Sequence, residues 1–138
     1  MLEVEIKKEF KNFKLDAKFS NEKGILGILG ASGSGKSLSL KAIEGIIKPD
    51  YGKIILNGRV LFDKEKKINI PTKDRKVGYL FQDYALFPNM TVYENIKTGL
   101  REKKGNFEKI INKKLEELHI SHIKNSTPNM ISGGEKQR

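Results

Sequence analysis

The sequence predicts an α/β fold, and three features of the chain indicate it. Residues 24–29 and 76–81 are short apolar runs without polar alternation, which is typical of parallel strands buried on both faces of a sheet. The segment at 38–47 follows the first run and repeats apolar residues at helical spacing. Apolar and charged residues alternate at 2–6 and 13–19, which predicts two antiparallel strands. We therefore expect a parallel sheet with helices, preceded by an antiparallel β subdomain.

The composition limits the classes of protein to which this chain can belong. Its 138 residues suffice for about one domain. No apolar run approaches the roughly 20 residues that span a membrane, and the N-terminus lacks the form of a signal peptide, so we expect a cytoplasmic location. The absence of cysteine excludes disulfides, and two histidines alone disfavour a zinc site. The net charge of +10 comes mostly from scattered lysines, which indicates a solvated surface rather than a nucleic-acid-binding stripe.

One stretch, residues 30–37, has the spacing of a phosphate-binding loop. It matches the pattern G-x-x-x-x-G-K-S/T and consists of Gly30, Ala31, Ser32, Gly33, Ser34, Gly35, Lys36 and Ser37. Glycines let successive backbone N–H groups turn inward around an anion, and the following helix adds its positive N-terminal end. Lys36 is then expected to reach the β- and γ-phosphates of ATP, and the Ser37 hydroxyl to complete the ligand shell of Mg²⁺. The alternative is a flexible Gly/Ser-rich linker, but a linker would not lie between a buried strand and a helix.

Local signals predict three further elements. Residues 53–62 contain an Asn-Gly pair between two apolar runs, which predicts a β-hairpin. A proline and a glycine at 48–52 are expected to end the helix that follows the loop. Thr91 and Glu94 form a capping-box pattern, so a short helix is expected to begin there. Residues 107–118 carry apolar side chains on one face and lysines on the other, as an amphipathic helix with a solvated face does.

Three places outside the loop are candidate parts of a binding site. Gln82 and Asp83 follow the second buried run, where open α/β sheets place their ligands. Phe10 lies at the join of two strands, where it could stack on a base or serve as an ordinary hairpin aromatic. The third place precedes a helix-forming run and offers a serine hydroxyl and backbone N–H groups to an anion. It consists of Ser132, Gly133, Gly134 and Glu135.

These motifs, in this order, resemble the ATP-binding subunits of ABC transporters. Residues 30–37 resemble the Walker A loop, Gln82 the glutamine of the Q-loop, and 132–138 the signature motif, with Ile131 where leucine is usual. The resemblance implies a P-loop NTPase (ABC-ATPase) core with an N-terminal antiparallel β subdomain and a helical subdomain. It also implies that Phe10 stacks on adenine and that Gln82 touches the magnesium ion or the attacking water. The signature serine would face the ATP held by a second copy.

The resemblance also suggests partners and a transported solute. Residues 56–61 and 76–88 are most similar to molybdate importers, although importers of sulfate, iron or polyamines share much of this pattern. The expected partners are a second ATP-binding subunit, in a homodimer, and membrane permease subunits, with no nucleic acid. The expected location is the cytoplasm, peripheral on the inner face of the cell membrane. Residues 1–138 are expected to form one truncated ATP-binding domain, with about 1–87 as β subdomain and P-loop core and about 88–138 as helical subdomain.

Some features of the family lie beyond the end of the sequence at Arg138. In the family, the signature helix leads into a strand that ends in Asp-Glu, and a switch histidine follows further on. We therefore expect an N-terminal part of a larger subunit, with an incomplete parallel sheet, no catalytic residue of its own apart from the accessory Gln82, and poor folding when isolated. Two other functions stay open: a nucleotide-binding protein without turnover, and an ABC-type ATPase that acts on nucleic acid or ribosomes.

Overall fold

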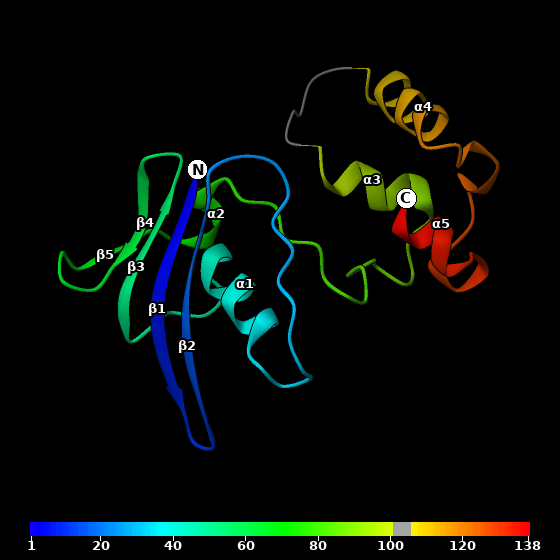
Figure 1. The fold of residues 1–138 in the computed structure, drawn as a ribbon. Helices are drawn as coiled ribbons and strands as arrows, with labels where there is room; N and C mark the ends of the chain where they lie inside the picture. The colour runs from blue at the N-terminus through cyan, green and yellow to red at the C-terminus, as the bar shows by residue number, and fades with distance from the viewer. Residues whose placement is uncertain (101–105) are drawn as a thin grey trace. The chain divides into compact units, whose positions relative to one another are not determined.

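An antiparallel sheet organises the N-terminal part of the chain (Figure 1). The computed structural model describes residues 1–100 and 106–138. Five strands pair in the order β2-β1-β3-β4-β5, and every described pair is antiparallel. The strands are β1 (Leu2–Phe10), β2 (Phe13–Asn21), β3 (Tyr51–Leu56), β4 (Arg59–Asp63) and β5 (Ile68–Asn69). The antiparallel strands and the hairpin that the sequence predicts are therefore confirmed.

The two hairpins follow from local sequence. Asn57 and Gly58 adopt φ values of 50° and 77°, the left-handed conformation that a two-residue β-hairpin requires at both central positions. In the first hairpin, Phe10 pairs directly with Phe13. Alternate side chains of β1 and β2 enter the core, while the opposite positions carry ion pairs such as Lys7–Asp16, at 2.9 Å. The alternation therefore gives the sheet one apolar and one charged face.

Helix α1 (Lys36–Glu44) packs on the apolar face of the sheet (Figure 1). The core of this unit combines residues of the helix with residues of four strands: Val4, Ile6, Leu15, Ala42, Ile43, Ile54, Leu61 and Phe62. The helix ends earlier than the sequence predicts, because Gly45 adopts φ 93° and caps it with an N–H bond to the carbonyl of Lys41. Leu40, one of the apolar residues that give 38–47 its helical spacing, is 44% exposed, whereas Ser39 is buried.

The parallel strands predicted at 24–29 and 76–81 are not formed. Residues 25–31 and 76–81 have no regular secondary structure. Ile25 is fully exposed and Leu29 is 95% exposed, whereas both were expected to be buried. An apolar run supplies side chains for burial, but a parallel strand also needs hydrogen-bonding neighbours in the sheet. Every strand that the structure describes belongs instead to the antiparallel sheet.

The C-terminal part of the chain is a second compact unit. The two units are Met1–Tyr79 and Leu80–Arg138. The first unit also contains the short helix α2 (Thr72–Arg75). The second contains α3 (Val92–Thr98), α4 (Phe107–Glu117), the 3₁₀ turns Ser121–Ile123 and Pro128–Met130, and α5 (Gly133–Gln137).

The second unit has its own small core. Val92, Ile111, Leu115, Ile120 and Ile123 are buried together. The predicted capping box is confirmed: the backbone N–H of Thr91 donates to Glu94 Oε2 at 2.8 Å, and the N–H of Glu94 donates back to Thr91 Oγ1 at 3.2 Å. The predicted amphipathic helix is also confirmed as α4. Within residues 1–100 and 106–138, no helix has the length and apolar character needed to cross a membrane.

Candidate functional site

The loop that the sequence predicts to bind phosphate is a tight turn that rests on strand β2. Gly33 and Gly35 adopt φ values of 79° and 92°, which side chains other than glycine rarely accept. A Cβ atom added to Gly35 would lie 2.6 Å from Leu15 Cδ1 and 3.2 Å from Phe13 Cζ. The sequence therefore needs glycine here for two reasons, the backbone conformation and the close approach of the hairpin to the loop.

Lys36 closes the loop on itself. It is the first residue of α1, and its Nζ donates to the carbonyl oxygens of Gly30, at 2.8 Å, and Ala31, at 2.7 Å. Ser34 Oγ lies 3.4 Å from the same ammonium group. One positive charge thus joins the beginning of the loop to the first turn of the helix.

The loop surrounds a hollow of about 220 Å³ that suits a negatively charged group. Residues 32–38 line it, and they offer serine hydroxyls and the Lys36 ammonium. The first amide groups of a helix have no acceptor within the helix, and the first turn of α1, which the structure describes in full, holds no acidic residue. This set of donors fits a phosphate group. Among the described residues, no group of three or more His, Cys, Asp or Glu side chains could hold a metal ion.

Phe10 is connected to the loop by a second aromatic residue, which lies between them. It is 37% exposed at the end of β1, and its ring centroid lies 6.3 Å from that of Phe13 at a tilt of 37°. Phe13 in turn lies beside Gly35 of the loop. No motif in the sequence indicated a role for Phe13 beside the loop. Its place opposite Phe10 across a two-residue turn was the signal that could have found it.

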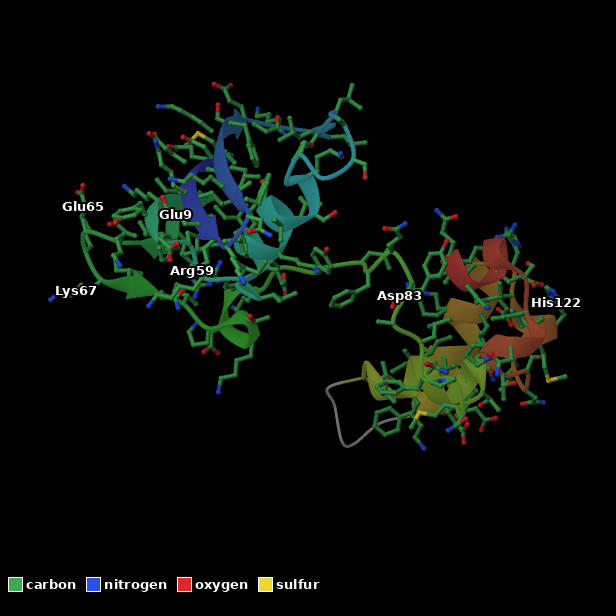
Figure 2. All side chains as sticks on the ribbon, turned by 90° about the horizontal axis from the view of Figure 1, so that it is seen from below. Glu9, Arg59, Glu65, Lys67, Asp83 and His122 are labelled. Atoms are coloured by element: carbon green, nitrogen blue, oxygen red, sulfur yellow. The ribbon has the colours of Figure 1, made fainter. Side chains whose placement is uncertain are left out.

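Gln82 belongs to the second unit, so the structure describes it apart from the loop. It is exposed and begins a turn at 82–85, instead of ending a strand as the sequence predicts. Tyr84 and Ala85 in this turn adopt φ values of 60° and 48°, a conformation that is uncommon for residues with a side chain. Asp83, also exposed, is labelled in Figure 2.

Ser132 caps α5 and is fully engaged by Glu135. The backbone N–H of Ser132 donates to Glu135 Oε2 at 2.8 Å, its hydroxyl donates to the same oxygen at 2.7 Å, and the N–H of Glu135 donates to Ser132 Oγ at 3.3 Å. These bonds, with a smaller contribution from His122, lower the pKa of Glu135 from 4.5 to about 2. The serine hydroxyl and N–H that were expected to face an anion therefore bind a carboxylate of the same motif.

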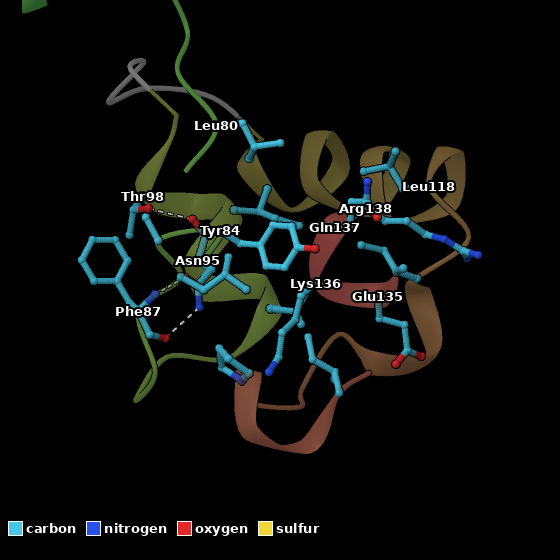
Figure 3. Close-up of a pocket in the computed structure, with 17 residues that line it drawn as sticks. Leu80, Tyr84, Phe87, Asn95, Thr98, Leu118, Glu135, Lys136, Gln137 and Arg138 are labelled. Carbon is cyan, nitrogen blue, oxygen red and sulfur yellow. Dashed lines mark hydrogen bonds between the residues drawn. The ribbon is translucent and has the colours of Figure 1, made fainter. Parts of the chain in front are cut away.

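A pocket of about 310 Å³ lies within the second unit (Figure 3). Its lining is mainly apolar and comes from the 80–87 segment, α3, α5 and the turns between α4 and α5. Asn95 fixes one wall, because it accepts from the N–H of Phe87 at 2.8 Å and donates to the Phe87 carbonyl at 3.2 Å. Nothing in the sequence pattern had indicated this pocket.

Comparison with known proteins assigns the family. The chain belongs to the ABC transporter family, whose model matches residues 13–138. Among solved structures, a dimeric ATP-binding cassette bound to ADP and Pi is similar, with a TM-score of 0.74 and 26% identity over 99% of this chain and 66% of the other. This similarity to a solved cassette confirms the ABC ATPase fold that the sequence predicts.

The curated relatives include ATP-binding proteins of metal-oxyanion importers. The molybdate/tungstate import ATP-binding protein WtpC of Methanocaldococcus jannaschii is 46% identical over all of this chain and 46% of its own length. The molybdenum import ATP-binding protein ModC of Haemophilus influenzae is 39% identical over all of this chain and 39% of its own length. The chain thus spans less than half the length of these relatives.

Proposed function

We propose that this chain is part of the ATP-binding subunit of an ABC importer, which binds and hydrolyses MgATP to drive uptake of a small oxyanion such as molybdate or tungstate. The observation that carries the proposal is the loop at residues 30–37, in which Lys36 binds the carbonyl groups of Gly30 and Ala31 and hydrogen-bond donors line a hollow. The names of the relatives WtpC and ModC support the choice of solute.

In this proposal, each candidate residue has a distinct role. The loop amides and Lys36 hold the phosphates, and Ser37 gives an oxygen to Mg²⁺, which neutralises charge on the phosphates when bound. Phe10 stacks on the base beside Phe13. Gln82 acts on the metal or the attacking water. We assign no catalytic carboxylate to the described residues.

The proposed assembly places two copies and a permease together. Ser132 and the glycines that follow it face the nucleotide held by the second copy. The dimeric state of the similar cassette supports this arrangement. The importers named among the relatives support a partner in the membrane, so we place the subunit on its inner, cytoplasmic face, without a nucleic-acid partner.

Calorimetric titration with MgATP tests the loop. The Lys36→Ala variant removes the charge-assisted contact, so the binding free energy should weaken by about 2 kcal/mol. The Kd should therefore rise roughly 30-fold. The control is Lys41→Ala, which removes a cation from the last turn of the same helix. An unchanged Kd in Lys36→Ala would contradict the assignment of the loop.

The identity of the transported solute is tested by ATP hydrolysis, measured on the subunit at its natural length assembled with its permease. Molybdate and tungstate should stimulate ATP hydrolysis, and sulfate should not. If sulfate alone stimulated ATP hydrolysis, the proposed solute would be wrong, although the assignment as an ABC importer would stand.

A further inference from the structure

Two consecutive residues of the turn that begins at Gln82 have a backbone conformation that side chains oppose. Tyr84 and Ala85 adopt φ values of 60° and 48°, in the left-handed region where a Cβ atom crowds a backbone carbonyl oxygen. A bulky residue such as tyrosine is a clear outlier there. Residues under such strain persist only where surrounding contacts hold them. The contacts on either side of this turn therefore decide its shape.

One contact before the strained residues and one after them fix this segment. The N–H of Tyr84 donates to the carbonyl oxygen of Phe81 at 3.0 Å. Phe87, further along, is held by the side chain of Asn95 on α3. Its N–H donates to Asn95 Oδ1 at 2.8 Å, and its carbonyl oxygen accepts from Asn95 Nδ2 at 3.2 Å (Figure 3). A single side-chain amide thus binds both backbone groups of Phe87, which fixes the direction of the chain as well as its position.

The anchor at Asn95 is itself held by the helix that carries it. Asn95 Nδ2 also lies 3.0 Å from the carbonyl oxygens of Met90 and Thr91, so its two N–H groups are shared among three acceptors. The side chain is only partly exposed, and Val92 of the same helix is buried in the core of the second unit. Asn95 therefore ties Phe87 to a packed element.

We infer that Asn95 is a positioning residue, which keeps the strained turn in place and thereby sets the direction of Gln82. The inference rests on the proposed function, in which Gln82 acts on the metal or the attacking water. Without the anchor at Phe87, the turn would relax towards ordinary φ values, and Gln82, its first residue, would move with it. Loss of Asn95 should therefore lower ATP hydrolysis. It should leave nucleotide affinity nearly unchanged, because the phosphate loop belongs to the first unit.

Three substitutions separate this role from a general loss of stability. Asn95→Ala removes every bond of the anchor. Ala85→Gly relieves strain, because glycine accepts φ 48° without a steric cost, so the turn should depend less on the anchor. Thr91→Ala is the matched control on the same helix. It removes the side-chain cap that accepts from the N–H of Glu94 at 3.2 Å, but it keeps the backbone carbonyl that Asn95 binds.

The first measurement is hydrogen exchange of the Phe87 backbone N–H, followed by NMR on the subunit at its natural length. In Asn95→Ala this N–H loses its acceptor, so it should exchange at least about tenfold faster. In Thr91→Ala the rate should change much less. An unchanged rate in Asn95→Ala would show that the anchor does not hold the segment, and the inference would be wrong.

The second measurement is steady-state ATP hydrolysis by the subunit at its natural length, assembled with its permease, together with the Kd for ATP. Hydrolysis should fall about fivefold or more in Asn95→Ala and return to at least about half of the unsubstituted rate when Ala85→Gly is added. Thr91→Ala should hydrolyse ATP at nearly the unsubstituted rate. The Kd should change by less than about twofold in all of these variants.

The Gln82→Ala variant distinguishes failure of this inference from failure of the proposed function. The inference is overturned if Gln82→Ala lowers hydrolysis and Asn95→Ala does not, or if Thr91→Ala lowers it as much as Asn95→Ala does. Absence of any recovery on adding Ala85→Gly would also overturn it, because the strain would then play no part. If Gln82→Ala hydrolyses ATP as fast as the unsubstituted subunit, the proposed role of Gln82 is wrong and the inference falls with it.

Discussion

The guanidinium group of Arg75 caps the carbonyl end of the helix that carries Lys36. Arg75 Nη1 donates to the carbonyl oxygens of Ala42 and Ile43, each at 2.7 Å, although the side chain is only 2% exposed. Burial lowers the pKa of Arg75, and the nearby Glu44 opposes this shift, so the group stays charged. A Cβ atom at Gly45 would lie 2.6 Å from Arg75 Nε, which leaves room there only for glycine.

Replacement of Arg75 should therefore destabilise the first unit. In Arg75→Met the buried carbonyls lose their donors, and the free energy of unfolding should fall by about 3 kcal/mol. Urea denaturation, followed by circular dichroism, measures this. Lys73→Met changes an exposed cation of the same short helix and should alter the midpoint little. Equal midpoints for both variants would contradict the capping role.

Two glycines of the loop allow steric and conformational costs to be separated. Both Gly33 and Gly35 have positive φ, but nothing lies within 4 Å of a Cβ at Gly33. Gly33→Ala should thus cost about 1 kcal/mol for the backbone alone. Gly35→Ala should cost at least about 1 kcal/mol more, because Leu15 must move.

A double-mutant cycle with Leu15→Ala checks the origin of this difference. In the double variant with Gly35→Ala, Leu15→Ala should recover the stability lost to the steric clash. In the double variant with Gly33→Ala, the two losses of stability should simply add. Additivity in both pairs would show that Leu15 does not press on the loop.

The cap of α5 should be sensitive to acid. The pKa of Glu135 is lowered in the folded state from 4.5 to about 2. Because the pKa is lower in the folded state, the ionised carboxylate stabilises the fold at pH values above about 4.5. This stabilisation is lost as the pH falls towards 2. The Glu135→Gln variant should lack this part of the pH dependence. Unfolding curves of both proteins between pH 6 and pH 2 test it, and parallel pH dependences would contradict the prediction.

Gln82 should matter for turnover more than for affinity. In the subunit at its natural length, assembled with its permease, Gln82→Ala should lower hydrolysis at least about tenfold and change the Kd for ATP by less than about threefold. Steady-state hydrolysis and calorimetry on the same preparation give both values. Glu116→Ala, at an exposed position of α4, is the control. Equal losses in hydrolysis and affinity would make Gln82 a binding residue only.

Local signals in the sequence predicted local structure well. The Asn57-Gly58 hairpin and the Thr91 capping box each depend on residues a few positions apart, and both are present. The run at 24–29 failed as a strand because pairing partners, unlike apolarity, cannot be read from the run itself. The contacts of Gly35 with Leu15 and of Glu135 with His122 also escaped prediction, since they join elements whose spatial order the pattern does not give.

The two carbonyl groups that bind Lys36 compete with any anion for its ammonium group. An incoming anion must displace the carbonyl oxygens of Gly30 and Ala31, which accept hydrogen bonds from the Lys36 ammonium at 2.8 and 2.7 Å. A monovalent ion such as chloride offers one diffuse charge against two well-aligned dipoles, whereas a polyphosphate brings several charges and several oxygens. We therefore expect the loop to prefer polyphosphates to the abundant small anions of the cell, independently of contacts with a base or a metal.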